Sequence, residues 1–316
     1  MDWDASLRTI ARVSIDEVRQ PSWWQISNDS VDVAVEELHF VDEAESVGLK
    51  FQYFESPDEA TEGRRMFEFT GGGVAVLDFD RDGTPDVYLT QGTQWPVGSG
   101  GEMSDQIFRN LDHERFENTT QVARVHEPGF SQGVSAGDID SDGFPDLYVA
   151  DFGQNRLFRN NGDGTFSDLK STTLTLAPVW TTSCVIADLN GDLIADLYDV
   201  NYVEGPLVAS EICSAEAGPR VCTPQGFDAA QDVLLFGTGD GNFKRAGDAA
   251  GLNDVSGKGL GIVVANLDSD PQLEVFIAND SVRNNLLDRR PTTNGELRYS
   301  DVALAAGLAF SADGNS

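Results

Sequence analysis

The sequence repeats one unit four times, and this repetition restricts the fold more than any other feature. The copies begin near Gly71, Gly133, Thr181 and Gly259, and each contains a small apolar segment, an acidic loop and a second apolar segment. Segments that fit a third and a fourth short strand follow, with turns such as 239–241 between them. Four short strands in a unit predict the blades of a β-propeller, because one four-stranded sheet cannot bury both of its faces and stacked neighbours can. We therefore expect an all-β fold built from four-stranded blades.

The domain organisation follows the repeat. Residues 40–316 are expected to form the blades, and the third unit carries an insertion at about 204–229. Residues 1–39 do not match the repeat and are predicted to be a short helix and linker, or the tail of a preceding domain. A β-sandwich is the competing architecture, but it would not require an acidic loop at the same strand junction of every unit.

The acidic loops are the part of the repeat that carries chemistry. They occupy residues 78–86, 138–146, 188–196 and 266–274, with acidic or amide side chains at positions one, three, five and nine. Calcium takes roughly six to eight oxygen ligands, and a tight loop can supply them from these side chains and from the backbone carbonyl at position seven. A solvated acidic turn is the competing interpretation of one such loop. Its return at equivalent points of four units favours Ca²⁺.

The predicted calcium ligands are Asp78, Asp80, Asp82, Thr84 and Asp86 in the first loop, Asp138, Asp140, Asp142, Phe144 and Asp146 in the second, Asp188, Asn190, Asp192, Ile194 and Asp196 in the third, and Asn266, Asp268, Asp270, Gln272 and Glu274 in the fourth. Position six is Gly83 and Gly143 in the first two loops, but Leu193 and Pro271 in the other two. If this position requires a positive φ, leucine costs about 1–2 kcal/mol there and proline cannot adopt it. We therefore expect weaker binding at the third loop and the weakest at the fourth.

The net charge limits which binding partners are expected, and the cysteine content indicates the cellular compartment. Asp and Glu number 53 against 21 Lys and Arg, and the net charge of -32 argues against a nucleic acid or an anionic membrane as partner. No segment has the apolar length that a membrane span needs, and no signal peptide is visible at the N-terminus. Cys213 and Cys222 lie close together in the insertion, and a disulfide between them would fit an oxidising compartment.

The loops and the phrases IFRN, LFRNNGDGTFSDL and VCTPQGFDAAQDVLLFGTGDGNF resemble the VCBS or FG-GAP repeats, the calcium-bearing blades also found in integrin α-chain propellers. The match extends from about Phe40 to the end. The segment FVDEAESVGLKFQYF and the cysteine-containing insertion are also similar to bacterial secreted propellers that adjoin ASPIC/UnbV domains. The resemblance implies a propeller of about seven blades, of which this chain supplies about four, as a partial propeller or part of a longer chain. It also implies calcium at the hairpin loops between the first and second strands of each blade.

A binding function is expected in preference to catalysis. Carboxylates neutralised by a metal at a blade edge cannot act as acid and base, whereas catalytic carboxyl pairs need environments that push their pKa values apart. The expected function is a non-catalytic, calcium-binding scaffold for recognition of, or adhesion to, an extracellular protein or carbohydrate; the alternative is a secreted propeller enzyme, a polysaccharide hydrolase or lyase. A secreted, cell-surface or periplasmic location, in a bacterium, fits either function. Trp95, the segment 98–101 and the insertion are the expected contact elements, although Trp95 could equally be packed within a blade.

Overall fold

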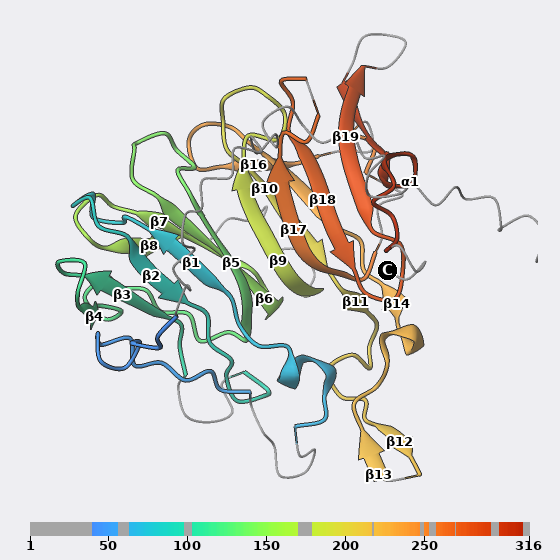
Figure 1. Ribbon diagram of the computed structural model, residues 1–316, viewed down its shortest axis with the longest axis horizontal. Coiled ribbons are helices and arrows are strands. Elements are labelled where there is room, and N and C mark those ends of the chain that lie inside the picture. Colours follow the sequence, from blue (N-terminus) through green and yellow to red (C-terminus); the bar gives the residue numbers. More distant parts are fainter. Residues whose placement is uncertain are drawn as a thin grey trace, which may run out of the picture. The chain divides into compact units, whose positions relative to one another are not determined.

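The computed structural model describes residues 40–55, 63–97, 103–169, 179–216, 218–246, 250–252, 257–268, 270–291 and 297–311 (Figure 1). The predicted helix or linker over 1–39 and the predicted contact segment 98–101 lie outside these residues. A compact unit extends over Glu43–Ser316. Its described helices are short, namely α1 (Ala303–Ala306) and the 3-10 helices η4 (Met66–Phe69) and η5 (Pro224–Gly226), and the other regular elements are strands. The prediction of an all-β fold is confirmed.

The strands form four consecutive antiparallel blades of four strands each. The first blade contains β1 (Val74–Leu77), β2 (Asp86–Leu89), β3 (Gln106–Asn110) and β4 (Phe116–Asn118). The second contains β5 (Ser131–Gly137), β6 (Asp146–Gly153), β7 (Arg156–Asn160) and β8 (Phe166–Asp168). The third contains β9 (Val179–Ala187), β10 (Asp196–Asn201), β15 (Val233–Gly237) and β16 (Phe243–Arg245), and the fourth β17 (Gly259–Ala265), β18 (Glu274–Asn279), β19 (Asn285–Pro291) and β20 (Leu297–Asp301). Because each strand pairs with the next one in its blade, the predicted propeller-blade pattern is confirmed.

The insertion in the third blade lies between β10 and β15 and forms two small ladders of its own. In one, β11 (Val203–Glu204) pairs with β14 (Asp228–Ala229). In the other, β12 (Cys213–Ala215) pairs with β13 (Gly218–Arg220). The insertion thus leaves the pairing of β10 with β15 intact, and it adds structure at the end of the blade away from the acidic loop.

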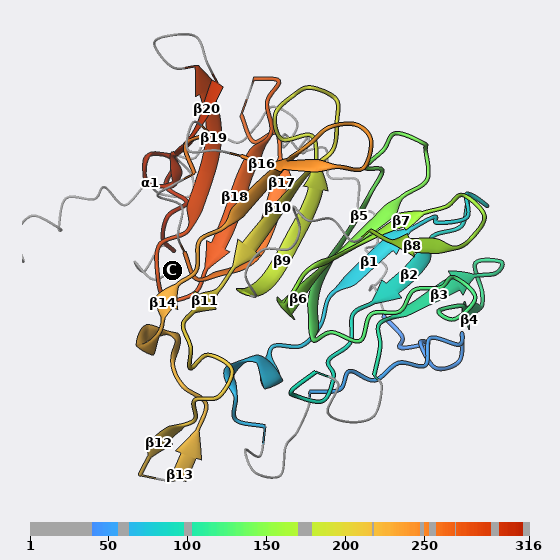
Figure 2. The same cartoon turned by 180° about the vertical axis from the view of Figure 1, so that it is seen from behind.

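Apolar clusters between consecutive blades form the core. The first cluster brings Leu77 and Tyr88 of the first blade against Leu147 and Val149 of the second. Two further clusters join the second blade to the third and the third to the fourth. Full burial of a leucine or valine contributes about 1.5–3 kcal/mol, so the packing of one blade on the next is the main source of stability. Figures 1 and 2 show the first strands β1, β5, β9 and β17 in succession across the blades.

Glycine at the start of two first strands permits the close approach of the blades. A Cβ atom at Gly73 would lie 2.9 Å from the carbonyl oxygen of Gln132, and one at Gly133 would lie 2.8 Å from that of Thr182. Carbon cannot approach a backbone oxygen this closely without displacing it, so a larger residue would separate the blades. Blade packing therefore requires glycine at these two positions.

The first and fourth blades each keep apolar side chains exposed. Val74 and Val76 of β1 are 59% and 63% exposed, whereas the equivalent Val134 and Ala136 of β5 pack against the preceding blade. On the other side, Val263 of β17 is 55% exposed. Residues that face a neighbouring blade in the middle of the array thus face solvent at its two ends, as far as the described residues extend.

Candidate metal centres and ligand pocket

The acid at position one shapes each of the first three acidic loops by accepting at least two backbone hydrogen bonds. Asp78 Oδ1 accepts from the N–H of Asp82 at 3.0 Å, and Asp78 Oδ2 accepts from that of Gly83 at 3.0 Å. Asp138 and Asp188 make the equivalent pairs of hydrogen bonds in the second and third loops. The backbone N–H groups in this tight turn have no partner in a neighbouring strand, and they donate to the carboxylate instead. This explains why aspartate recurs at position one.

The acid at position nine is buried at the start of each second strand. Asp86 Oδ2 accepts from the N–H of Phe79 at 3.1 Å, and Asp86 Oδ1 accepts from the N–H of Asn110 in the third strand at 2.8 Å. Burial raises the pKa of Asp86 to about 6, and that of the equivalent Asp146 to about 7. These carboxyls therefore tie the acidic loop to the second and third strands at the point where a cation would neutralise them.

Three carboxylates converge in each of the first two loops. Ligand oxygens of Asp78, Asp80 and Asp86 all lie within 4.8 Å of one another, and so do those of the equivalent Asp138, Asp140 and Asp146. Oxygens at this separation can bind one ion at the 2.3–2.6 Å typical of calcium. The donor atoms include no thiolate or imidazole, so the residues present fit a hard cation.

Arg109 adds a feature that is particular to the first loop. Its Nε lies 2.5 Å from Asp80 Oδ2, and its Nη2 lies 3.0 Å from Asp82 Oδ2. The guanidinium and a cation at this loop would share the carboxylates at positions three and five.

The third loop departs from the first two at positions three and six. Leu193 has φ 69°, in the same left-handed region as Gly83 at 87° and Gly143 at 89°, so the expected positive φ at position six is confirmed for these loops. Asn190 stands at position three, and its amide nitrogen donates to Asp192 Oδ2 at 3.0 Å. An amide that presents N–H to the neighbouring acid is a poorer calcium ligand than the carboxylates of Asp80 and Asp140.

The fourth loop assembles a different set of acids. Asp268, Asp270 and Glu274, at positions three, five and nine, have ligand oxygens within 4.8 Å of one another. Asn266 at position one donates its amide to the carbonyl of Asp270, and it offers one acceptor oxygen where aspartate offers two. Pro271 is not in the left-handed region. Weaker binding at the third loop and the weakest binding at the fourth both stay predictions.

A second set of polar contacts, at the other end of the blades, was not predicted from the sequence. A tyrosine two residues after the position-nine acid donates its hydroxyl to a buried aspartate. These hydrogen bonds join Tyr88 to Asp105 at 2.7 Å, Tyr148 to Asp199 at 2.7 Å and Tyr198 to Asp232 at 3.1 Å. The tyrosines recur visibly as Asp-x-Tyr, but their partners occur at irregular separations, so only the tyrosine half of the pattern could have been found.

Two of the predicted contact elements meet in one cavity of about 450 Å³. The lining consists of Trp95, Phe152, Gly153, Val179, Trp180, Val203, Glu204, Gly205, Val208 and Ala209. Trp95 lies 5.0 Å from Phe67 and 4.9 Å from Phe152 between ring centroids, so it both packs within the fold and lines the cavity. The indole N–H of Trp180 is already used, because it donates to Gln132 Oε1. Among the described lining residues, Glu204 supplies the charge.

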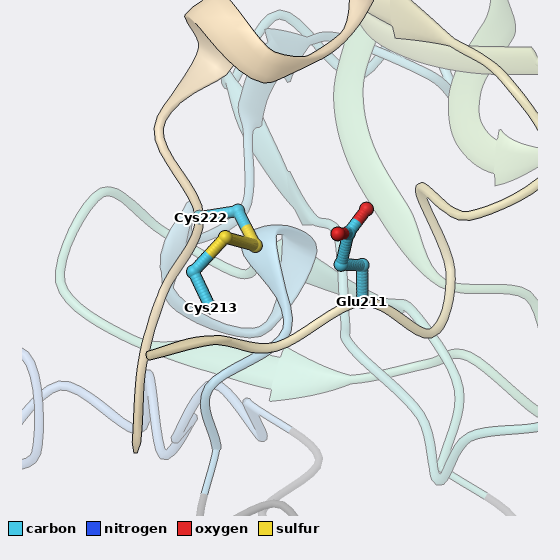
Figure 3. A group of neighbouring side chains, drawn as sticks. All are labelled: Glu211, Cys213 and Cys222. Atoms are coloured by element: carbon cyan, nitrogen blue, oxygen red, sulfur yellow. A yellow bond between two sulfur atoms is a disulfide. The ribbon is translucent and has the colours of Figure 1, made fainter. Parts of the chain in front are cut away.

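The predicted disulfide is present. Cys213 and Cys222 are bonded with their Cα atoms 4.9 Å apart, and Figure 3 shows Glu211 beside them. These three residues are close enough to resemble a metal-ligand group. Sulfur atoms joined in a disulfide are not thiolates, however, and this group is therefore not a candidate metal centre.

None of the described helices has the length and apolar character needed to cross a membrane.

Comparison with known sequences identifies the repeat. The model of the FG-GAP-like repeat matches residues 78–149 and again 138–198, so that each match begins at an acidic loop and ends in the following blade. Cartilage acidic protein 1 of Xenopus tropicalis is 26% identical over 241 residues, which cover 73% of this chain and 34% of the relative. The human protein of the same name is 23% identical over 242 residues, covering 73% and 33%. The chain thus spans about a third of the length of these curated relatives.

Solved structures are only distantly similar. A lectin from Agrocybe aegerita that recognises non-reducing terminal N-acetylglucosamine aligns with 72% of this chain and 65% of its own, at 17% identity and a TM-score of 0.30. A periplasmic gluconolactonase from Pseudomonas aeruginosa aligns with 68% of each chain, at 13% identity and a TM-score of 0.28. Likeness at this level carries no argument about function. The sequence matches and the blades they cover agree, and the chain carries FG-GAP-like repeats in propeller-like blades.

Proposed function

We propose that the chain is a calcium-binding, non-catalytic scaffold that recognises an extracellular ligand. The observation that carries this proposal is the convergence of three carboxylates at the same hairpin of the first and second blades. Asp78, Asp80 and Asp86 would hold the ion in the first loop, with the equivalent aspartates in the second. Repulsion among such close carboxylates opposes the turn, and a divalent cation would convert it into attraction that joins the first, second and third strands.

The aromatic cavity supports a role in recognition. Its lining is apolar apart from Glu204 and backbone groups, so it suits an apolar side chain of a protein partner next to a basic group. A sugar fits less well, because its hydroxyls need hydrogen-bond partners that this lining has few of. The cavity therefore favours a protein segment as the ligand. Binding of a carbohydrate in the test below would contradict this choice.

Burial of the other acids supports a function without catalysis. Outside the loops, the carboxyl pKa is strongly raised by burial at Asp105, Glu127, Asp151 and Asp232. All four are 6% exposed or less, so these carboxyls cannot contact a polysaccharide in the described fold. A hydrolase or lyase would need an accessible pair with separated pKa values.

The disulfide supports a secreted, cell-surface or periplasmic location, because such bonds persist in oxidising compartments.

The exposed Val74 and Val76 support a partial propeller, since equivalent residues elsewhere in the array are covered by a preceding blade. Further blades or domains of a longer chain are the partners that would cover these faces.

Thermal unfolding with and without calcium tests the metal role. The full chain would be heated in EDTA and in about 1 mM Ca²⁺, a range used by extracellular calcium modules. We expect calcium to raise the unfolding temperature, and Asp80→Ala and Asp140→Ala each to reduce that rise. Asp163→Ala is the matched control, because Asp163 lies in an exposed hairpin turn outside the converging groups. No calcium response, or equal responses in all four proteins, would contradict the proposal.

The ligand role is tested by filling the cavity. The chain and Ala209→Trp would be applied to an array of peptides that carry an apolar residue beside lysine or arginine, and to an array of glycans. Selective peptide binding that is lost in Ala209→Trp and weakened in Glu204→Gln is the expected result. Glycan retention would redirect the search to carbohydrate, and release of glycan fragments would show that the chain is an enzyme.

A further inference from the structure

Three buried carboxyls gather where the first and second blades meet, at the end of the strands away from the acidic loops. Asp105 precedes β3, Glu127 lies between β4 and β5, and Asp151 is near the end of β6. Asp105 and Glu127 are 0% exposed and Asp151 is 2% exposed. The hairpin loops contribute none of these residues, so the group is separate from the candidate calcium loops.

The charge of this group is not balanced by the described residues. Arg156 is the cation in contact with it, with Nε 2.6 Å from Glu127 Oε2 and Nη1 3.0 Å from Asp168 Oδ2. If Arg156 neutralises Glu127, the carboxyls of Asp105 and Asp151 remain. Burial of unpaired carboxylates is strongly unfavourable, and the group must therefore take up protons or a cation.

Hydrogen bonding distinguishes Asp151 from the other two acids. Asp105 accepts from the hydroxyl of Tyr88 and from the N–H of Gln91, both at 2.7 Å, and Glu127 Oε1 accepts from the N–H of Gly129 at 2.6 Å. Both carboxyl oxygens of Asp151 lack a hydrogen-bond partner among the described residues. An orphaned, fully buried carboxyl is rare and calls for a ligand.

The repeat makes this acid unusual. The residue five positions after the position-nine acid is Gln91, Asp151, Asn201 and Asn279 in the four blades. The amides of Gln91 and Asn201 each donate to a backbone carbonyl and accept a further hydrogen bond. Only the second blade places a carboxylate at this position, and both of its oxygens are left unpaired, whereas in the fourth blade the single amide oxygen of Asn279 is unpaired.

Two further features turn oxygen atoms toward Asp151. A Cβ atom at Gly129 would lie 2.5 Å from Glu127 Oε1 and 3.0 Å from Asp151 Oδ1, so the two carboxylates flank one point that glycine leaves open. Ser131 is fully buried and its Oγ is also unpartnered among the described residues. Burial and the charges of Glu127 and Asp105 raise the pKa of Asp151, whereas the nearby Ser131 hydroxyl opposes that shift.

We propose that Asp151, Glu127 and Ser131 hold a hard divalent cation between the first and second blades. The donors are two carboxylates and a hydroxyl, the oxygen set that calcium and magnesium prefer. A divalent ion and Arg156 together balance the charges of the three buried carboxylates, and Asp105 stabilises the site from its hydrogen-bonded position. A cavity of about 590 Å³, lined in part by Gln91, Ser104 and Asp105, borders the group at Asp105.

Ion counting on the full chain tests this proposal. The chain would be equilibrated by dialysis against Ca²⁺ alone and against Mg²⁺ alone, and the bound ions counted. Wild type should hold one ion more than Asp151→Asn with at least one of the two metals. Asp232→Asn is the matched control, because Asp232 is a buried acid at the same end of the third blade whose oxygens accept from Tyr198 and Asn201. It should bind as many ions as wild type.

The loop sites must be counted separately. Asp80→Ala and Asp140→Ala should each bind fewer ions than wild type, whether or not Asp151 is also replaced. The ion counts therefore distinguish a wrong proposal for the acidic loops from a wrong proposal for this inner site. If Asp151→Asn does not fold, Ser131→Ala and Gly129→Ala replace it, and each should weaken the inner ion by roughly tenfold or more. Equal counts in wild type and Asp151→Asn, with Asp151→Asn at least as stable in EDTA, would overturn the proposal and show that a proton neutralises the group.

Discussion

Replacement of the residue at position six should change stability in opposite directions in the third and first acidic loops. Leu193 has φ 69° and is 88% exposed, so glycine at this position removes backbone strain and almost no packing. The relief is about 1–2 kcal/mol, from which the greater freedom of glycine in the unfolded chain subtracts about 0.4–1 kcal/mol. Leu193→Gly should therefore raise the free energy of unfolding by about 1 kcal/mol.

Gly83→Leu is the reciprocal change. Gly83 has φ 87°, and no heavy atom beyond the adjacent residues lies within 4 Å of the position that a Cβ would take. The cost is then backbone strain alone, and the free energy of unfolding should fall by about 1 kcal/mol. Leu193→Ala is the control for the exposed side chain, because alanine keeps the Cβ and with it most of the strain.

Urea unfolding in EDTA, followed by circular dichroism, measures these differences without a contribution from bound calcium. Repeating the series in calcium then reports whether the relaxed third loop binds more tightly, as the proposed ranking of the loops requires. The reasoning would be refuted if Leu193→Gly were destabilising, if Leu193→Ala gained as much as Leu193→Gly, or if Gly83→Leu had no effect.

Two further predictions concern the buried tyrosine and aspartate pairs. Tyr148→Phe removes the hydroxyl that donates to Asp199 at 2.7 Å and accepts from Asn155 at 3.3 Å. It should lower the free energy of unfolding, measured in urea, by about 1–3 kcal/mol, because two buried polar side chains each lose a hydrogen bond. An unchanged midpoint would contradict this. Burial raises the pKa of Asp232 from 3.8 to about 8, so between those pH values the folded chain holds a proton that the unfolded chain releases, and stability should fall as pH rises. Asp232→Asn should flatten this fall in unfolding measured from pH 4 to 8, and equal slopes would show that another group is responsible.

Much of the fold could be predicted because the same local sequence pattern occurs in four units. The acidic loop with Asp78 and Asp86, the strands on either side and the glycine before them are local, and each recurs with little change. Pairing within a hairpin follows from such short-range patterns. The disulfide between Cys213 and Cys222 also lies within reach of local reasoning, since nine residues separate the two.

The remaining contacts depend on segments that meet only in the folded chain. Trp95 and Val208 line the same cavity although about two repeats of sequence separate them. The acids that receive the tyrosine hydroxyls, such as Asp105 for Tyr88, follow loops of unequal length, so their separation carries no signal.

The sequence by itself determined the all-β class, the four acidic loops and their oxygen donors, because these arise from residue spacing within single hairpins. Only the tertiary structure decided which donors converge, that position six of the third loop is strained, and that Asp151 meets Glu127 and Ser131 in the interior. The physical reason is that charge balance and burial are properties of neighbours in space. The sequence does not show whether a carboxylate is surrounded by solvent, by an arginine or by other carboxylates.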